Sequence, residues 1–264
     1  MKPSIEERNH EDSKSSRSLM PLLNALVSGW LMGSWPLGLP AQENPLFQAE
    51  KLFAGRDRVE DLREAITLLE NSLAREPSNY EILWRLAKYK YYLSDRQKDD
   101  AGKLKLLKDG IEAAKKAVNL ESKRPEGHFW LAANYGSYAE LEGLFKSLWL
   151  IKTIRSEFEW ALRLDSAYEN GGVYLALGEM DIRLPKLLGG SDRRGLAQLE
   201  NGLKVGPNNL DLRLFLGEIY VKIGRKEDGK KLLESVTNLA DPARTALEQE
   251  ELRSKARRLL EKMR

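Results

Sequence analysis

Apolar residues recur at helical spacing along most of this chain, in single stripes separated by polar positions. Residues three or four apart share one face of an α-helix, so each stripe predicts a helix with one face to bury. No stretch alternates apolar and polar residues with period two over several residues, as a half-buried strand would. The pattern therefore predicts an all-α protein. The stripes are Ala65, Leu69 and Leu73; Ala113, Ala117 and Leu120; Phe158, Ala161 and Leu164; and Leu199 and Leu203.

Four segments with the same order of residue types divide the chain at regular intervals. They start at residues 72, 117, 161 and 202, so they are 45, 44 and 41 residues apart, and a looser fifth copy ends at Asp241-Pro242. Each segment has a small residue, then apolar positions, then residues that stop a helix. An aromatic residue follows each at a nearly constant distance. A repeat of this length predicts a pair of antiparallel helices, A and B, whose apolar stripe is covered by the neighbouring pair.

The expected helix A alternates large and small residues, with glycines at 178 and 217. A small residue allows the partner helix to approach, and the large residues fill the groove beside it. The segments 174–178 (Tyr-Leu-Ala-Leu-Gly) and 216–220 (Leu-Gly-Glu-Ile-Tyr) resemble helix A of the tetratricopeptide family. The resemblance covers about residues 45–242 and implies a tetratricopeptide-like helical-hairpin solenoid with elongated repeats, since the family repeat has about 34 residues.

The additional residues of each repeat are expected between helix A and helix B. They would form a charged loop at 94–100, an apolar and aromatic loop at 138–149, and a loop at 184–192. Loops of this length are often functional. After the last repeat, residues 242–264 carry an apolar stripe that includes Leu252 and Ala256, which predicts a C-terminal capping helix because an end repeat would otherwise expose its face.

Composition narrows the function. The 43 Lys and Arg residues nearly balance 40 Asp and Glu residues, which argues against nucleic-acid binding. The chain has no cysteine and two histidines, His10 and His128, so disulfides, thiolate metal sites and histidine-based catalysis are not expected. Carboxylates abound, but no pair stands apart from the other charges. We expect no enzyme activity, no cofactor and no metal site.

The N-terminal region has the features of an export signal. Residues 19–39 contain no charged side chain, and Lys14 and Arg17 precede them. The stretch ends in Leu-Pro-Ala-Gln at 39–42, which favours cleavage after Ala41. We therefore expect a signal peptide at 1–41, a mature repeat domain at 42–264 and a periplasmic or otherwise extracytoplasmic location. The alternative is an uncleaved N-terminal membrane anchor.

The segment 184–191 (Leu-Pro-Lys-Leu-Leu-Gly-Gly-Ser), followed by a helix and then Pro-Asn-Asn at 207–209, resembles a narrower family. This is the T component associated with tripartite ATP-independent periplasmic (TRAP) transporters. The resemblance implies a periplasmic module that forms homo-oligomers, pairs with a substrate-binding partner subunit and offers a hydrophobic cleft. A second resemblance is to the regulator of microtubule dynamics family, which also has elongated repeats. An export signal argues against that second family.

Aromatic residues are concentrated between 127 and 174, and they divide into two groups. One group lies at repeat positions and is expected in the core: Trp130, Phe158, Trp160 and Tyr174. The other lies near or within the loop expected at 138–149, where it could contact a ligand or partner or could equally be core: Tyr135, Tyr138, Phe145 and Trp149.

Two further features have a structural and a functional interpretation. Leu187, Gly189, Gly190 and Ser191 are a candidate partner loop, but the simpler expectation is a turn in which Ser191 or Asp192 caps the next helix. His128 has neither a second histidine nor a cysteine near it, so we expect an interhelical hydrogen-bonded histidine rather than a ligand.

Two functional hypotheses remain. The first is an exported accessory component of a TRAP-type transport system that docks a substrate-binding protein and holds a hydrophobic small molecule. The second is a protein-protein interaction scaffold of the cell envelope with no small-molecule site. Inward-facing aromatic side chains at 138–149 would favour the first, and a loop facing solvent the second.

Overall fold

The computed structural model describes residues 44–143 and 147–263. The predicted signal peptide at 1–41 lies outside the described residues, which all belong to the compact unit Gln42–Arg264. The described part is helical, with eleven α-helices, one short 3₁₀ helix and no strand, as the periodicity predicts. None of its helices combines the length and the apolar character needed to cross a membrane.

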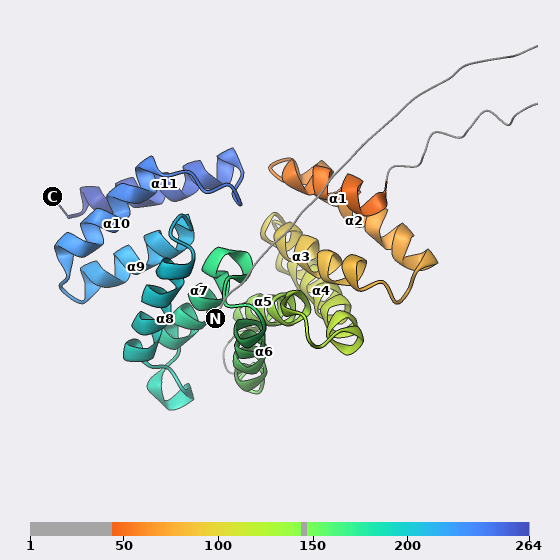
Figure 1. Cartoon of the computed structure of the whole chain (residues 1–264), viewed down its shortest axis with the longest axis horizontal. Helices are drawn as coiled ribbons and strands as arrows, with labels where there is room; N and C mark the ends of the chain where they lie inside the picture. Colours follow the sequence, from red (N-terminus) through yellow and green to blue (C-terminus); the bar gives the residue numbers. More distant parts are fainter. Residues whose placement is uncertain (1–43, 144–146, 264) are drawn as a thin grey trace, which may run out of the picture. The chain divides into compact units, whose positions relative to one another are not determined.

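The α-helices form five antiparallel pairs and a final capping helix (Figure 1). The second helix of each pair packs against the first helix of the next pair, and the first helices also contact one another. Helices α3, α5, α7 and α9 lie on the inner side of the arc. The arrangement is a tetratricopeptide-like helical repeat. The pairs are α1 (Pro45–Ala54) with α2 (Val59–Arg75), α3 (Tyr80–Asp95) with α4 (Asp100–Leu120), α5 (Pro125–Glu142) with α6 (Leu150–Leu164), α7 (Tyr168–Arg183) with α8 (Asp192–Val205), and α9 (Leu210–Lys222) with α10 (Lys226–Asn238), followed by α11 (Ala246–Glu261).

The additional residues of the second and third repeats lie mainly in helices, which corrects the loops expected at 94–100 and at the start of 138–149. Residues 184–191, by contrast, do connect α7 and α8, close to the loop expected at 184–192. Helix α4 has 21 residues, and only residues 96–99 separate it from α3. Helix α5 continues to Glu142, so Tyr138 is helical and not part of a loop. The physical reason is that 138–142 (Tyr-Ala-Glu-Leu-Glu) contains good helix formers and neither glycine nor proline, so the helix ends only at Gly143, where φ is +87°.

Glycines 178 and 217 allow the two helices of a pair to approach, as the sequence predicts. A Cβ at Gly178 would lie 2.7 Å from Cγ of Leu199 on α8. A Cβ at Gly217 would lie 3.1 Å from side-chain atoms of Leu233 on α10. Both leucines are fully buried, so the small residues set the distance between the helices.

The capping helix has the predicted role. Leu252 and Ala256 of α11 are buried and pack with Leu233 and Val236 of α10 and with Leu210 of α9. The capping box at its start is complete, since the Thr245 side chain accepts from the Glu248 backbone N–H and the Glu248 side chain accepts from that of Thr245.

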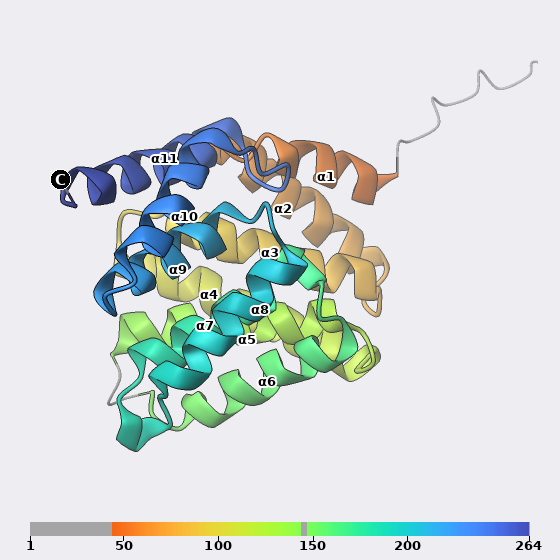
Figure 2. The same cartoon turned by 60° about the vertical axis from the view of Figure 1, so that its left-hand side comes forward.

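The two ends of the repeat array contact each other. Both views place α11 beside α1 (Figures 1 and 2). Arg56, in the turn after α1, donates to both carboxylate oxygens of Glu248 at 3.0 and 2.7 Å and to the Ala243 carbonyl oxygen at 2.8 Å. Arg56 and Glu248 are both buried. We call this set of contacts, together with the hydrogen bond from Thr245 to Asp57, the end clasp.

Candidate functional site

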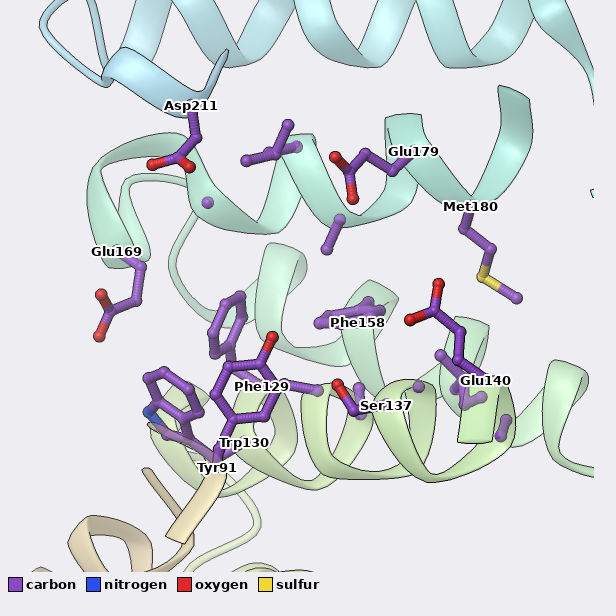
Figure 3. A pocket seen from close by; sticks show the side chains of 18 of the residues that line it. Tyr91, Phe129, Trp130, Ser137, Glu140, Phe158, Glu169, Glu179, Met180 and Asp211 are labelled. Carbon is purple, nitrogen blue, oxygen red and sulfur yellow. The ribbon is translucent and has the colours of Figure 1, made fainter. Parts of the chain in front are cut away.

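A cavity of about 690 Å³ lies on the inner side of the arc, between α3, α5, α6, α7 and α9. It exists because the residues that face it are small: Ala132, Ala133 and Gly136 on α5, and Gly172 and Ala176 on α7. Small side chains on facing helices leave space that leucine or phenylalanine would fill. Its volume falls in the range of ligand pockets, roughly 300–1,000 Å³. Figure 3 shows this cavity, called the inner pocket below.

Aromatic rings form one end of the inner pocket. Trp130 has its ring centroid 5.6 Å from that of Tyr91 and 5.0 Å from that of Phe129, and Phe129 makes an edge contact with Phe158. The Trp130 indole N–H donates to the Tyr168 hydroxyl at 2.9 Å, so the polar edge of the indole is satisfied. The rings come from α3, α5 and α6, and they form a rigid apolar floor.

Five carboxylates line the same pocket, against two basic side chains. Glu140 on α5 and Glu179 on α7 point into the cavity from opposite walls, and the Tyr91 hydroxyl points into the same space (Figure 3). The remaining carboxylates are those of Asp95, Glu169 and Asp211, and the basic residues are Arg183 and Arg244. The pocket is therefore acidic, although the chain as a whole has a net charge of +3.

The carboxylates of the inner pocket repel one another. Burial raises the pKa of Glu179; the charge of Arg183 lowers it in part, and the charges of Asp211 and Glu140 raise it further. Burial also raises the pKa of Asp95; the charges of Arg96 and Lys103 lower it in part, and Glu140 adds to the increase. Asp211 has a raised pKa for the same first cause, although Arg244 lowers it in part. These carboxylates therefore carry negative charge that the surrounding protein stabilises less well than water would.

The basic residues leave this charge only partly neutralised. Arg244 lies 2.6 Å from Asp211, and Lys88, outside the lining, lies 2.8 Å from Glu169. Arg183 approaches Glu179 at 3.5 Å and Glu140 at 3.8 Å, and its side chain is mostly exposed. Asp95 has no ion pair within 4 Å among the described residues. The middle of the pocket thus has the least compensated charge.

An unusual backbone places Glu169 at the rim. Glu169 and Asn170 have φ of +50° and +53°, followed by Gly171 at +80°. Two consecutive non-glycine residues in this left-handed region are strained and persist only where surrounding contacts hold them. Here the Asn170 carbonyl oxygen accepts from Asn209 at 3.0 Å, and Lys88 holds the Glu169 carboxylate. With this backbone, Glu169 is one of the residues that line the inner pocket.

Three of the aromatic residues predicted as ligand or partner contacts, Tyr135, Tyr138 and Trp149, are not among those that line the inner pocket. Tyr135 and Tyr138 are half-buried, with Lys115 and Lys108 of α4 over their rings. Trp149 is 68% exposed at the start of α6. Phe145 lies outside the described residues. Contact by any of the four with a ligand or partner stays a prediction.

The residues predicted to be core are largely so. Trp130 and Phe158 are buried, and Tyr174 is half-buried. Trp160 is the exception, with 46% of its surface exposed, because it lies on the outer face of α6, where the Arg163 guanidinium lies 4.2 Å from its ring centroid.

The candidate partner loop has a structural explanation. The 3₁₀ helix η1 (Lys186–Leu188) is followed by Gly189, whose φ is +90°. A Cβ at Gly190 would lie 1.8 Å from the Leu184 carbonyl oxygen, so only glycine fits there. Ser191 caps α8 by accepting from the Arg194 N–H, as predicted. Leu187 is 96% exposed, and its contact with a partner stays a prediction.

His128 is an interhelical histidine, as expected. It is buried, with Nδ1 2.5 Å from the Glu157 carboxylate and Nε2 2.9 Å from the Ser122 carbonyl oxygen. Both neighbours are acceptors, so they favour the ring with both nitrogens protonated, and the pKa of His128 is raised. Among the described residues, no three histidine or acidic side chains are arranged to hold a metal ion.

The sequence analysis missed the carboxylates of the inner pocket. The sequence does contain a pattern that could have indicated them. In two inner helices, small residues at helical spacing are followed on the same face by an acidic residue. On α5 these are Ala132, Ala133, Gly136 and Glu140, and on α7 they are Gly172, Ala176 and Glu179. The abundance of charged residues along the chain hid this pattern, because nearly every helix carries several.

Part of the chain is similar to a known family. Residues 46–175, slightly less than half of the chain, match the model described as Regulator of microtubule dynamics protein 1-3. The Mus musculus protein named Regulator of microtubule dynamics protein 3 is 32% identical over 124 residues, 47% of this chain and 25% of that protein. The Rattus norvegicus protein of the same name is 28% identical over 132 residues, 50% of this chain and 26% of its own length. The chain thus spans about a quarter of the length of these curated relatives.

A solved structure supports the fold. A thermophilic TPR protein from Thermus thermophilus superposes with a TM-score of 0.58, covering 82% of this chain and 98% of that one, at 23% identity. At this identity the likeness establishes the helical repeat fold alone. Of the two families that the sequence resembles, the comparisons favour the regulator of microtubule dynamics family, and they lend no support to the TRAP T component.

Proposed function

We propose that this protein is a protein-protein interaction scaffold that binds a segment of a partner polypeptide in its inner pocket. The observation that carries the proposal is the pocket itself, a cavity of about 690 Å³ with a rigid aromatic floor on the inner side of a helical repeat array. Helical repeats present extended concave surfaces of this kind to their partners. This is the second of the two functions that the sequence suggests.

The first function, a TRAP-type transport accessory with a hydrophobic small molecule, has less support. It depended on the segment 184–191, which the turn geometry and the helix cap account for. A neutral apolar ligand in the inner pocket would also remove water from carboxylates that line it, such as the half-buried Glu179, without replacing their hydrogen bonds, which is costly. A polypeptide carries polar groups and charges that can replace that water.

The curated relatives are named as regulators of microtubule dynamics, and this chain matches one part of them. We propose that the shared part is the interaction module and that its partner here need not be the same. The chain matches no more than about a quarter of those proteins, so the rest of their activity has no counterpart in this proposal.

The proposal can be tested by selecting binders from a random peptide library displayed on phage, using the purified full chain. Selected peptides are then titrated against Ala176→Trp, which fills the inner pocket, and Ala197→Trp, which adds the same ring to an exposed position of α8. We expect binding to be lost with the first variant and kept with the second. Failure to select any peptide, or equal binding by both variants, would reject the pocket as a polypeptide site.

We also propose that the chain is exported, because the charge-free stretch at 19–39 ends in a cleavage pattern at Ala41. A mature form that begins near Gln42 should then be found by N-terminal sequencing of the protein from intact cells. Recovery of a chain that still begins at Met1 in a soluble cytoplasmic fraction would contradict export.

A further inference from the structure

We infer that the polypeptide segment bound in the inner pocket is cationic, with an arginine or lysine side chain placed between Glu140 and Glu179. The inference rests on the proposed function and specifies its partner. The apolar stem of such a side chain would lie over the aromatic floor, and its charged end would meet the carboxylates on the opposite walls. Long basic side chains have this division between an apolar stem and a charged end.

The sign of the charge is the first argument. The pocket carries five carboxylates against two guanidinium groups, in a chain whose Lys and Arg residues outnumber its Asp and Glu residues, 43 to 40. The acidic character is therefore local to the inner helices and does not follow from the overall charge. A pocket of one sign attracts a ligand group of the other sign and disfavours anionic ligands such as phosphates and fatty acids.

The arrangement of the carboxylates is the second argument. Glu140 acts electrostatically on both Asp95 and Glu179, and Glu179 in turn feels Asp211. These four side chains come from α5, α3, α7 and α9, so four inner helices each contribute one carboxylate to a connected array. Arg183, 3.5 Å from Glu179 and 3.8 Å from Glu140, offsets part of the repulsion in this array, and a bound cation would relieve the remainder. The relief is larger for Glu179, which is half-buried, than for Glu140, whose side chain is 75% exposed, because charges interact more strongly away from water.

The aromatic floor is the third argument. Tyr91 and Trp130 present ring surfaces to the pocket beside the carboxylates. Ring faces attract a guanidinium or ammonium group. Such a contact exists just outside the lining, where Nζ of Lys88 lies 5.2 Å from the Trp130 ring centroid. An organic cation is also the one that fits, because the described residues offer no cluster suited to a metal ion.

The experiment uses two sets of peptides of leucine and glycine. One set contains two arginines, and the other has citrulline in place of each arginine. Citrulline keeps the length and hydrogen-bonding shape of arginine but has no charge. Fluorescence anisotropy on the full chain should show that the exchange weakens binding about tenfold or more. The double variant Glu140→Gln/Glu179→Gln should bind the arginine peptide more weakly than the parent does, by a similar factor. Its affinity for the citrulline peptide should change by less than about twofold.

The control is Glu64→Gln/Glu112→Gln, which removes two carboxylates of the same type from exposed positions on α2 and α4. We expect this variant to bind the arginine peptide as the parent does. Equal loss in both double variants would mean that net charge alone attracts the peptide, and it would overturn the inference. Circular dichroism of both variants checks that they are folded.

The remaining outcomes separate the two proposals. If peptides selected from the library bind in the pocket but citrulline is as good as arginine, the cationic partner is wrong while the interaction function stands. If no library peptide binds, both proposals fail. If free spermidine binds more tightly than every arginine peptide, the cation is a small molecule and the polypeptide partner is overturned.

Discussion

Gly178 shows how one residue fixes the distance between two helices. Its missing side chain leaves room for Leu199, and a Cβ would also lie 3.2 Å from the Gly195 carbonyl oxygen. Gly136, on the inner face of α5, is different, because a Cβ there would meet no atom within 4 Å. Glycine thus allows close helix packing at position 178 and leaves space open in the pocket at position 136.

The two glycines predict opposite effects of the same substitution. Gly178→Ala should lower the free energy of unfolding by about 1–3 kcal/mol through overpacking, and Gly178→Leu by more. Gly136→Ala should raise it by about 0.5–1 kcal/mol, because alanine favours the helix over the unfolded chain. Urea unfolding of the variants measures both. A Gly178→Ala protein as stable as the parent would mean that α7 and α8 do not pack this closely.

His128 links the start of α5 to α6 through a charged hydrogen bond. Burial and the charge of Arg163 lower its pKa, but the hydrogen bonds to Glu157 and the Ser122 carbonyl oxygen, with the Glu157 charge, outweigh them, so the pKa is raised. The protonated ring therefore stabilises the fold fully below its unfolded pKa of about 6.5. This contribution is lost as the pH rises through the higher pKa of the folded state.

We therefore expect the stability difference between the parent and Glu157→Gln to shrink with rising pH. Urea unfolding between about pH 6 and pH 9 covers the range in which the ring loses its proton. Taking the difference removes the contributions of the pocket carboxylates, which both proteins share. A difference that stays constant across this range would show that His128 does not titrate there.

At the scale of elements, Trp149 before α6 and Trp130 on α5 differ in how much of their surface is exposed. Trp149 stands in this connection and is 68% exposed, whereas Trp130, on α5, is 3% exposed. Trp149→Ala should change the free energy of unfolding by no more than about 0.5 kcal/mol. Trp130→Ala should cost about 3–5 kcal/mol, because it leaves a cavity among packed rings. Thermal melting of the two variants side by side is the measurement.

The same pair tests the prediction that Trp149 contacts a partner. A Trp149→Ala protein that keeps its melting temperature but loses a selected peptide would make Trp149 part of the binding surface. Unchanged peptide binding would show that Trp149 is not part of the binding surface. A large drop in melting temperature would instead return Trp149 to the core, contrary to its exposure.

At the scale of the whole repeat unit, the end clasp joins residues 192 positions apart in the sequence. Arg56 binds Glu248 through two hydrogen bonds in a buried setting, so removing one partner leaves a buried charge behind. Arg244, next to the clasp, is at the same time part of the inner pocket. The closed arrangement of the array and the shape of the pocket therefore depend on the same turn.

Arg56→Met should lower the free energy of unfolding by about 3–5 kcal/mol, and the double variant Arg56→Met/Glu248→Met should recover part of this loss. Lys105→Met is the control, because it breaks the exposed pair with Asp109 and should cost no more than about 1 kcal/mol. Urea unfolding measures the energies, and small-angle X-ray scattering should show a larger radius of gyration for Arg56→Met. An unchanged radius and stability would mean that the clasp does not hold the ends together.

The sequence by itself determined the helices, their pairing and the close approaches at Gly178 and Gly217. These features depend on spacings of three or four residues within a helix and on contacts between helices that follow each other in the chain. Because the pattern is repeated, the same contacts are indicated in several helix pairs. The cap of α8 at Ser191 and the capping helix α11 could be predicted for the same local reason.

Only the tertiary structure decided where the pocket lies and what it contains. Tyr91, Glu140, Glu179 and Asp211 come from four different helix pairs, and they meet because each pair is rotated slightly relative to the one before. Those rotations depend on the packing of many side chains at once and leave no periodic mark in the sequence. The contact of Arg56 with Glu248 has the same origin, since it requires all the rotations together to bring the last helix back beside the first.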